Sequence, residues 1–237
     1  MKISLCPGDI VDPPVRRTLS CPYSSTFLDL HIAIQIAFDW AGTHAFDFSI
    51  KDPNAEPEPV LDVNDMIKKY MSASGRGPQM DEGPPQNLLR IVSGSRHGID
   101  RMHERFRTHS RTSEIPAGRI RFGKTMESKE YKGAPLEYDY DFGDGWKHHI
   151  EIIGRAPATN TFICTAGEGH GVAEDVGSLE GWQKLKEAYR TQSPNKEQKD
   201  KMQWFERMCS NKDSHGLGGE RVHMWDQIGV NFKLSRM

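Results

Sequence analysis

The chain has 237 residues, of which 36% are hydrophobic and 27% are charged, and its formal net charge at pH 7 is -2. This length and composition fit a globular protein with one main core, and they exclude a chain that is disordered throughout. The near-neutral charge argues against a generally basic nucleic-acid-binding protein, although local patches survive the average.

The amino-terminal sequence and the distribution of apolar residues indicate where the protein resides. The segment MKISLCPGDIVDPP lacks the basic flank and apolar run of a secretion signal. No stretch approaches the ~20 apolar residues of a membrane span. The four cysteines form no CxxC pair, so reduced and mostly buried thiols are expected rather than a zinc site. We therefore expect a protein of the cytoplasm or nucleus, assign it to the cytoplasm, and expect no membrane contact.

Apolar periodicity predicts three elements in the first fifty residues: a strand at 15–20, an amphipathic helix at 27–40 and a strand at 45–50. The residues Ser24, Ser25 and Thr26 precede the helix and are candidates for its N-cap. The dipeptide Asp52-Pro53 closes the second strand. The chain therefore begins with a strand, a helix and a strand.

A polar and irregular region follows. A short helix is expected at 62–71, and residues 72–85 are rich in Gly, Pro and Ser, which predicts a mobile insertion. Residues 96–124 carry eight Lys or Arg against three acids. This basic stretch is either a solvated helix face near 98–109 or a surface that contacts nucleic-acid phosphates. On the second interpretation the RNA-binding residues are Arg96, Arg101, Arg105, Arg107 and Arg111.

The run LEYDYDFGDGWKHHIE at 136–151 alternates on both sides of Gly143-Asp144-Gly145, which predicts a tight hairpin. One face carries Tyr138, Tyr140 and Phe142 on the first strand and Trp146, His148 and Ile150 on the second. The opposite face carries Glu137, Asp139 and Asp141, followed by Lys147, His149 and Glu151.

Three carboxylates at alternate positions repel one another unless a cation, a basic partner or a buried hydrogen-bond network absorbs their charge. Asp139 or Asp141 beside a histidine could act as general base or acid, and the same carboxylates could bind a cationic substrate. The alternative is a solvent-facing edge strand in which Asp144 only stabilises the turn. A metal is not expected, because adjacent His148 and His149 point to opposite faces of a strand.

A second polar cluster lies in the glycine-rich segment CTAGEGHGVAED at 164–175, which contains Glu168, His170, Glu174 and Asp175. The alternative interpretation is a helix entry with Asp175 or Ser178 as N-cap, which explains Asp175 better than Glu174. Two helices are expected after it, at 179–189 and 196–208. The alternation of Ile228, Val230, Phe232 and Leu234 predicts a last strand.

Histidines early in the chain have a plainer interpretation. His31 lies on the helix at 27–40 and His44 just beyond it, on either side of Trp40. A lone histidine on a largely apolar helix is more often a core residue than a catalyst. The chain contains no GxSxG elbow, HExxH motif, Walker loop or dinucleotide fingerprint in context, which disfavours standard hydrolases, zinc proteases and nucleotide-cofactor enzymes.

Three stretches carry a resemblance to a known family: the blocks at about 16–48 and 137–189, with the hairpin motif YDYDFGDGWKHHIEI as the most specific part, and a looser match at 225–234. Together they resemble the plasmid pRiA4b ORF-3-like family. The tryptophan that usually precedes the paired arginines, here Arg16 and Arg17, is missing, and Ser178 replaces a usual glycine. These departures indicate a divergent branch, expected to be fungal.

The resemblance implies a compact α+β fold that is associated with mobile elements in bacteria. We expect a mixed or antiparallel sheet with a central acidic β-hairpin, packed against several helices. The expected domain is a single one at 1–237, with a variable insertion at about 52–130.

The chain is also similar to fungal arginine-containing cyclodipeptide synthases, which draw amino acids from charged tRNA. This resemblance implies a cyclodipeptide synthase that uses charged tRNA, including arginyl-tRNA, and needs no cofactor. The expected catalytic residues are Asp139, Asp141, His148 and Glu174. The expected substrate-binding residues are Tyr138, Trp146, Glu151, His31, Trp40 and Asp175. The alternatives are a non-enzymatic nucleic-acid-associated module of the mobile-element type and a scaffold that binds a protein partner.

Overall fold

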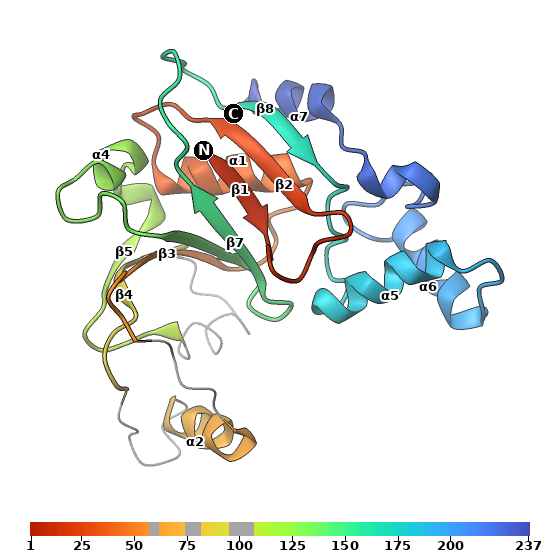
Figure 1. Cartoon of the computed structure of the whole chain (residues 1–237), viewed down its shortest axis with the longest axis horizontal. Helices are drawn as coiled ribbons and strands as arrows, with labels where there is room; N and C mark the ends of the chain where they lie inside the picture. Colours follow the sequence, from red (N-terminus) through yellow and green to blue (C-terminus); the bar gives the residue numbers. More distant parts are fainter. Residues whose placement is uncertain (57–61, 74–81, 95–106) are drawn as a thin grey trace.

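Eight strands form one open, mixed sheet in the order β5-β4-β3-β6-β7-β1-β2-β8 (Figure 1). This computed structural model describes residues 1–56, 62–73, 82–94 and 107–237. The strands are β1 (Lys2–Leu5), β2 (Val15–Ser20), β3 (Phe46–Lys51), β4 (Asn87–Val92), β5 (Ser113–Pro116), β6 (Leu136–Tyr140), β7 (Trp146–Glu151) and β8 (Ile163–Glu168). Adjacent strands are antiparallel except for the parallel pair β4 and β5. The α+β fold with a central acidic hairpin is confirmed.

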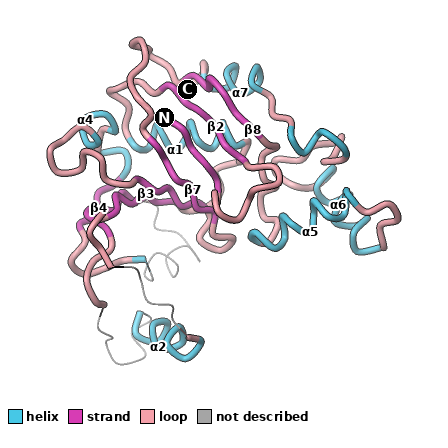
Figure 2. Tube along the Cα trace, in the orientation of Figure 1, coloured by secondary structure: helices cyan, strands magenta, loops and turns pink. Residues whose placement is uncertain are grey.

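Helices lie against one face of the sheet, beyond its β8 edge and toward its β4 end (Figure 2). They are α1 (Phe27–Phe38), α2 (Val63–Ala73), α4 (Phe122–Met126), α5 (Ser178–Arg190), α6 (Lys196–Arg207) and α7 (Gln227–Leu234), with short 3-10 turns η1 (Ala117–Arg119) and η2 (Gly219–His223). In Figure 1, α1 crosses behind β1 and β2. Helix α7 contacts α1 and β8, and α5 contacts α6. The sheet thus has one face packed against a helix and one polar face.

Helix α1 begins and ends where its sequence predicts a change of conformation. Thr26 and Asp29 form a reciprocal capping box, so the N-cap prediction is confirmed for Thr26. Asp39 adopts a left-handed conformation, φ 61°, and ends the helix after Phe38. Trp40 therefore lies outside the helix, which is two residues shorter than its apolar pattern predicts.

Arg17 of β2 ties the helix layer to the sheet. Its side chain is only 2% exposed and donates hydrogen bonds to carbonyl oxygens of Ala37 at 2.8 Å, Glu168 at 2.7 Å and Gly169 at 3.0 Å. Its guanidinium also lies 4.8 Å from the ring centroid of Trp225. Burial lowers the pKa of Arg17 to about 10, so the side chain stays charged at neutral pH. A single cation thereby joins the end of α1, strand β2 and the end of β8.

The carboxyl-terminal tail is a helix, and the prediction of a last strand is wrong. Residues Val230 and Leu234 of α7 are buried, whereas Ile228 and Phe232 are exposed. In a strand, residues 228, 230, 232 and 234 would all lie on one face, which is why their spacing predicted a strand. In a helix, residues four positions apart share a face, so Val230 and Leu234 lie on one side and Ile228 and Phe232 on another. Asp226 settles the choice, because its side chain accepts from the amide of Gly229 and caps a helix.

The helix entry at α5 also differs from its expectation. Gly177 is the N-cap, with φ 87°, and no side chain caps the helix. Asp175 and Ser178 both have left-handed backbones, with φ 58° and 64°. The alternative interpretation, in which one of them is the N-cap, is therefore wrong, and the Asp175 carboxylate bonds His44 instead.

The region expected as a variable insertion contributes β4 and β5 to the common sheet. Among the helices in the described ranges, none combines the length and apolarity needed to cross a membrane.

Replacing Arg17 with Met should cost roughly 2–4 kcal/mol of unfolding free energy, because buried carbonyl acceptors lose their donor. Arg16→Met is the matched control, since Arg16 forms a partly exposed ion pair with Glu168 at 2.9 Å. The Arg16→Met variant should lose less than about 1 kcal/mol of unfolding free energy. Urea denaturation measures both, and equal losses would show that Arg17 does not hold the layers together.

Candidate functional site

The candidate site begins at the turn of the acidic hairpin. Asp141 leaves β6 in a left-handed conformation, φ 51°. Its Oδ1 accepts hydrogen bonds from the amides of Gly143 at 3.0 Å and Asp144 at 3.2 Å. Aspartate favours such turns because its short side chain can bond the backbone that follows it. The turn leaves the second oxygen, Oδ2, 3.7 Å from Nε2 of His44.

Three segments far apart in sequence meet beside this turn, and we call His44, Asp141 and Asp175 the His44 cluster. One ligand atom from each side chain lies within 4.8 Å of the others. Nε2 of His44 lies 3.0 Å from Oδ1 of Asp175. The side chain of His44 is 27% exposed and that of Asp175 is 61% exposed. The cluster is therefore an anionic site that solvent and a ligand can reach.

Glu174 lies directly beneath the His44 cluster and is 1% exposed. Its Oε2 accepts from the amide of Ala41 at 2.9 Å and the hydroxyl of Ser210 at 2.8 Å. Its Oε1 accepts from the hydroxyls of Tyr140 and Thr43. Burial and then the Glu174 charge raise the pKa of Tyr140, so this phenol stays protonated as a donor. Four donors occupy Glu174, which makes it a positioning residue for the turn that carries His44.

Two further contacts fix the loop that carries Asp175. Asp144 accepts from the amide of Gly177 at 3.1 Å, which joins the hairpin turn to the entry of α5. Trp40 donates its indole N–H to the carbonyl of Val172 at 2.9 Å. One exposed and one buried hydrogen bond therefore hold this loop in place.

The predicted base His148 lies inside the protein, together with Tyr138 and Trp146, and all three side chains are fully buried. Burial lowers the pKa of His148 to about 3, so it is neutral at physiological pH. Its Nδ1 lies 3.2 Å from the carbonyl oxygen of Tyr138. A proton donor or acceptor must reach its substrate, and these three residues are enclosed by the helix layer.

His31 and Trp40 also belong to the buried aromatic layer. The His31 ring stacks on Phe46 with centroids 3.6 Å apart, and its Nδ1 lies 2.8 Å from the hydroxyl of Tyr138. Burial lowers the pKa of His31 to about 3. The Trp40 ring stacks on Tyr140 at 4.9 Å. Both side chains support the site from below and do not face an incoming substrate.

Asp139 is neutralised by the protein itself. Arg107 donates to Oδ2 of Asp139 at 2.6 Å and, through two nitrogens at 2.9 Å each, to both oxygens of Asp47. Arg90 bonds the same Asp47 from β4. Burial alone would raise the pKa of Asp47, but the charges of Arg107 and Arg90 hold it below its usual value. The row of alternating carboxylates Glu137, Asp139 and Asp141, which we call the acidic ladder, thus binds a guanidinium of the protein itself. Asp139 does not line an open recess.

Glu137 and Glu151 of the hairpin lie near lysines. Glu137 accepts from Lys147 at 3.1 Å and lies 3.3 Å from Lys51, and these cations hold its pKa low against the opposing effect of burial. Glu151 lies 4.0 Å from Lys2 at the far end of β7. Glu151 is therefore remote from the turn and separate from the His44 cluster.

The basic stretch divides between described and undescribed residues. Arg96, Arg101 and Arg105 lie outside the described residues. The guanidinium of Arg107 bonds Asp47 and Asp139 and lies 4.6 Å from the ring centroid of Phe142. Burial alone would lower the pKa of Arg107, but the charges of Asp47 and Asp139 raise it. Arg111 is exposed and donates to the carbonyl of Gly83. Arg107 is partly exposed but bonded to two carboxylates, whereas Arg111 is exposed, and the prediction that these arginines contact RNA stays a prediction.

The His44 cluster also has the donor set of a divalent-cation site, with one imidazole nitrogen and two carboxylate oxygens. The expectation that no metal is bound stays a prediction, because exposed acidic groups occur in many proteins without an ion. The same donors can receive an ammonium or guanidinium group through charge-assisted hydrogen bonds.

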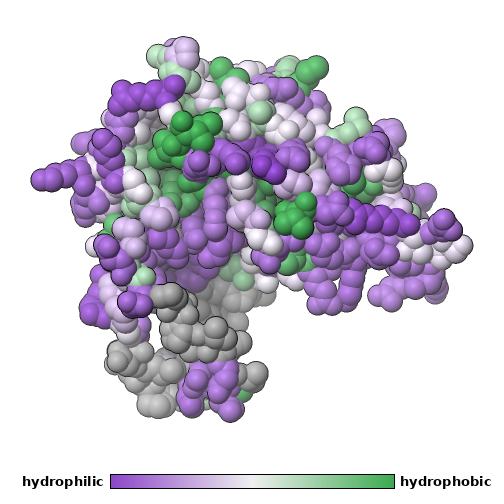
Figure 3. Space-filling view, in the orientation of Figure 1, coloured by the Kyte–Doolittle hydropathy of each residue, from purple (hydrophilic) through white to green (hydrophobic). Residues whose placement is uncertain are grey.

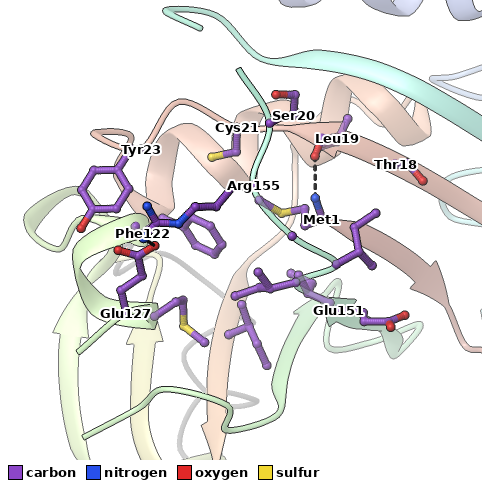
Figure 4. A pocket seen from close by; sticks show the side chains of 18 of the residues that line it. Met1, Thr18, Leu19, Ser20, Cys21, Tyr23, Phe122, Glu127, Glu151 and Arg155 are labelled. Atoms are coloured by element: carbon purple, nitrogen blue, oxygen red, sulfur yellow. Dashed lines mark hydrogen bonds and ion pairs between the residues drawn. The ribbon is translucent and has the colours of Figure 1, made fainter. Parts of the chain in front are cut away.

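A large groove of about 1430 Å3 lies at the opposite end of the hairpin, where Glu137 and Glu151 line it. Figure 4 shows Arg155 and Glu127 meeting near Tyr23, and the Met1 ammonium bonded to the carbonyl of Leu19. Figure 3 shows a hydrophobic patch in the same region. Of the predicted site residues that the structure describes, only Glu151 lines this groove, so the groove and the His44 cluster are separate features.

Sequence patterns missed His44 as a member of the site. It lies in the loop between α1 and β3, two residues before β3 begins, and no motif marks it. The available signal was its position at the end of a turn next to a strand, where polar side chains of a functional site are often presented. Its partners Asp141 and Asp175 were predicted, but their convergence on one imidazole depends on tertiary contacts.

Comparisons with known proteins agree with the fold. The model of the family described as plasmid pRiA4b ORF-3-like protein matches residues 2–214. The uncharacterized protein y4hQ of Sinorhizobium fredii is 24% identical over 190 residues, which cover 79% of this chain and 71% of that protein. A crystal structure of MM3350, a protein of unknown function from Methanosarcina mazei Go1, superposes with a TM-score of 0.56 at 21% identity. The match covers 95% of this chain and 93% of that one.

Replacing Asp47 with Asn should destabilise the protein by about 3–5 kcal/mol at pH 7, because the buried Arg90 and the partly exposed Arg107 lose their shared carboxylate. The pKa of Asp47 is lowered by folding, so its contribution is complete above the unfolded value of about 4 and is lost as pH falls through the folded value. The difference between wild type and variant should therefore be constant at neutral pH and narrow below about pH 4.

Urea denaturation at pH 7, 5 and 3 measures this difference. The exposed Asp9→Asn is the charge-matched control and should behave as wild type at each pH. A difference that grew toward acid pH would contradict the ion-pair assignment.

Proposed function

The chain belongs to the plasmid pRiA4b ORF-3-like family, and from this premise we propose that it is an aminoacyl-tRNA-dependent cyclodipeptide synthase that forms an arginine-containing cyclic dipeptide. The observation that supports the proposal is the His44 cluster, where two carboxylates and an imidazole meet at the surface. Within the described part of the chain, no lysine or arginine forms an ion pair with Asp141 or Asp175. The cluster therefore retains negative charge for a cationic substrate.

The first step of the proposal is binding of the arginyl group. Its guanidinium carries five N–H donors in a planar fork that matches carboxylate geometry. The internal bridge from Arg107 to Asp47 and Asp139 has this arrangement within the same protein. At the His44 cluster the carboxylates of Asp141 and Asp175 can accept from an arginyl side chain or from the α-ammonium group of either aminoacyl ester.

The second step is aminolysis, with His44 as general base. Asp175 orients the ring through Nε2, and in the described part of the chain no hydrogen bond engages Nδ1. His44 takes a proton from the α-amine of one aminoacyl-tRNA as the nitrogen attacks the ester carbonyl of the other. The new C–N bond replaces the ester C–O bond, and the proton passes to the departing ribose hydroxyl of the tRNA.

The third step closes the ring. The free amine of the dipeptidyl ester attacks its own ester carbonyl, and a second C–N bond replaces the remaining ester bond. The second tRNA leaves as the alcohol, and no water, oxidant or phosphate is consumed. Positioning and proton transfer suffice for both steps because each aminoacyl ester is already activated.

Charged tRNAs, including arginyl-tRNA, are the substrates for the direct test. The intact protein should release a cyclic dipeptide that contains arginine, detected by mass spectrometry, and ribonuclease treatment of the tRNA should abolish it. Absence of any such product would remove the proposal, and retained RNA binding without product would favour a nucleic-acid-associated module instead.

Replacing His44 with Gln should lower the rate of product formation by about 100-fold or more, because a positioned general base contributes on the order of 10²–10⁴. His149→Gln is the matched control, since His149 is exposed on β7 and is not part of the His44 cluster. It should retain the wild-type rate. Equal rates for the two variants would show that His44 is not the base.

Asp141→Asn separates charge from fold. The amide oxygen of Asn can still accept from Gly143 and Asp144, so the turn should persist, while the negative charge is lost. We expect the KM for arginyl-tRNA to rise about tenfold or more, with thermal stability close to wild type. An unchanged KM would exclude Asp141 as a ligand of the cationic group.

A further inference from the structure

A second cavity, of about 330 Å3, lies between α5 and the segment around η2. Its lining residues are Lys186, Tyr189, Arg190, Leu217, Gly219 and Val222. None of them belongs to the His44 cluster or to the proposed catalytic machinery. The volume falls at the lower end of the range of about 300–1,000 Å3 that small-molecule sites occupy.

The unusual feature of this cavity is its buried lysine. Lys186 is 2% exposed, yet its ammonium donates to a single acceptor in the described part of the chain, the backbone carbonyl of Asp12, at 2.7 Å. The ammonium also lies 5.8 Å from the ring centroid of Trp182. An ammonium carries three N–H donors, and burial of a charge without an anionic partner is costly. Two donors of Lys186 remain for a ligand.

The charges around the cavity favour an anion. The carboxylate of Asp12 is paired with Arg190 at 2.8 Å. In the described part of the chain no carboxylate forms an ion pair with Lys186, which leaves its positive charge without an anionic contact. Glu206 bonds the hydroxyl of Tyr189 at 2.8 Å and does not line the cavity. Burial and then the charge of Arg190 lower the pKa of Lys186, an effect that a bound anion would reverse.

We propose that this cavity binds a small oxyanion, the phosphate or carboxylate group of a metabolite, between the ammonium of Lys186 and the guanidinium of Arg190. The ammonium offers a point charge with free donors, and the guanidinium offers a planar fork at the rim. The remaining space, bounded by Leu217 and Val222, accommodates an apolar part of the ligand. The site is independent of the proposed synthase activity and can be tested without it.

Isothermal titration of the full-length protein with inorganic phosphate, and separately with acetate, tests the proposal at constant ionic strength set with sodium chloride. Wild type should show saturable binding of at least one anion, and which anion binds identifies the ligand class. Lys186→Met should weaken that binding at least about tenfold, because it removes a charge-assisted hydrogen bond. Lys184→Met is the matched control on the same helix, since Lys184 is exposed and paired with Glu180. It should bind as wild type.

Nuclear magnetic resonance of the wild-type protein gives a measurement that does not depend on folding of the variant. The same anion should shift the amide resonances of Arg190 and Gly219 and leave that of Glu180 unchanged. Absence of saturable binding of both anions, equal binding by Lys186→Met, or shifts confined to other parts of the protein would each overturn the proposal.

Discussion

The bridge between Arg107, Asp47 and Asp139 is the interaction on which the interpretation of the acidic hairpin depends. Carboxylates on neighbouring strands cannot remain buried and charged without a counterion, because desolvation penalises the charged form. The protein supplies its own guanidinium, which bonds both oxygens of Asp47 and one of Asp139. The charge of the ladder is therefore part of the fold. Of Glu137, Asp139 and Asp141, only Asp141 has no lysine or arginine partner among the described residues, and it lies at the turn in the His44 cluster.

The backbone conformations of Asp141 and Asp175 position the His44 cluster. Left-handed residues at Asp141 and Asp175 turn both carboxylates toward His44, and neither is a glycine. Such conformations cost free energy, and they persist where surrounding contacts over-determine them. Glu174 provides those contacts through four hydrogen bonds, to Ala41 and Thr43 of the loop before β3, to Tyr140 and to Ser210. Glu174 thus positions the residues around it, whereas the more exposed Asp175 can contact a ligand.

Local sequence patterns predicted those parts of the fold in which apolar period and turn chemistry agree. Alternation around the glycines at 143 and 145 predicted β6 and β7, and the capping residue Thr26 marked the start of α1. The tail failed because Val230 and Leu234 fit both a strand and a helix until Asp226 is recognised as a cap. Strand β8 was missed because residues 163–168 contain a glycine and polar residues, and its pairing with β2 is a tertiary contact.

The candidate site was predictable only in part for the same reason. Asp141, Glu174 and Asp175 stand out as acids in turn-rich segments, so their residue types carry a local signal. The burial of His148 and the recruitment of Arg107 depend on which side of the sheet the helices cover. Periodicity placed His148 on the same face as Trp146. Because that face is buried, His148 cannot contact a substrate.

The central claim is that an arginyl group binds at the His44 cluster and not on the strands of the acidic ladder. A titration with L-arginine methyl ester, followed by the imidazole carbon and proton resonances of the histidines, tests it most directly. The account predicts saturable shifts at His44 while the resonances of His31 and His148 stay in place. Shifts of the backbone resonances at Asp47 and Asp139 with none at His44 would contradict it, because the ester would then be displacing Arg107 from the ladder.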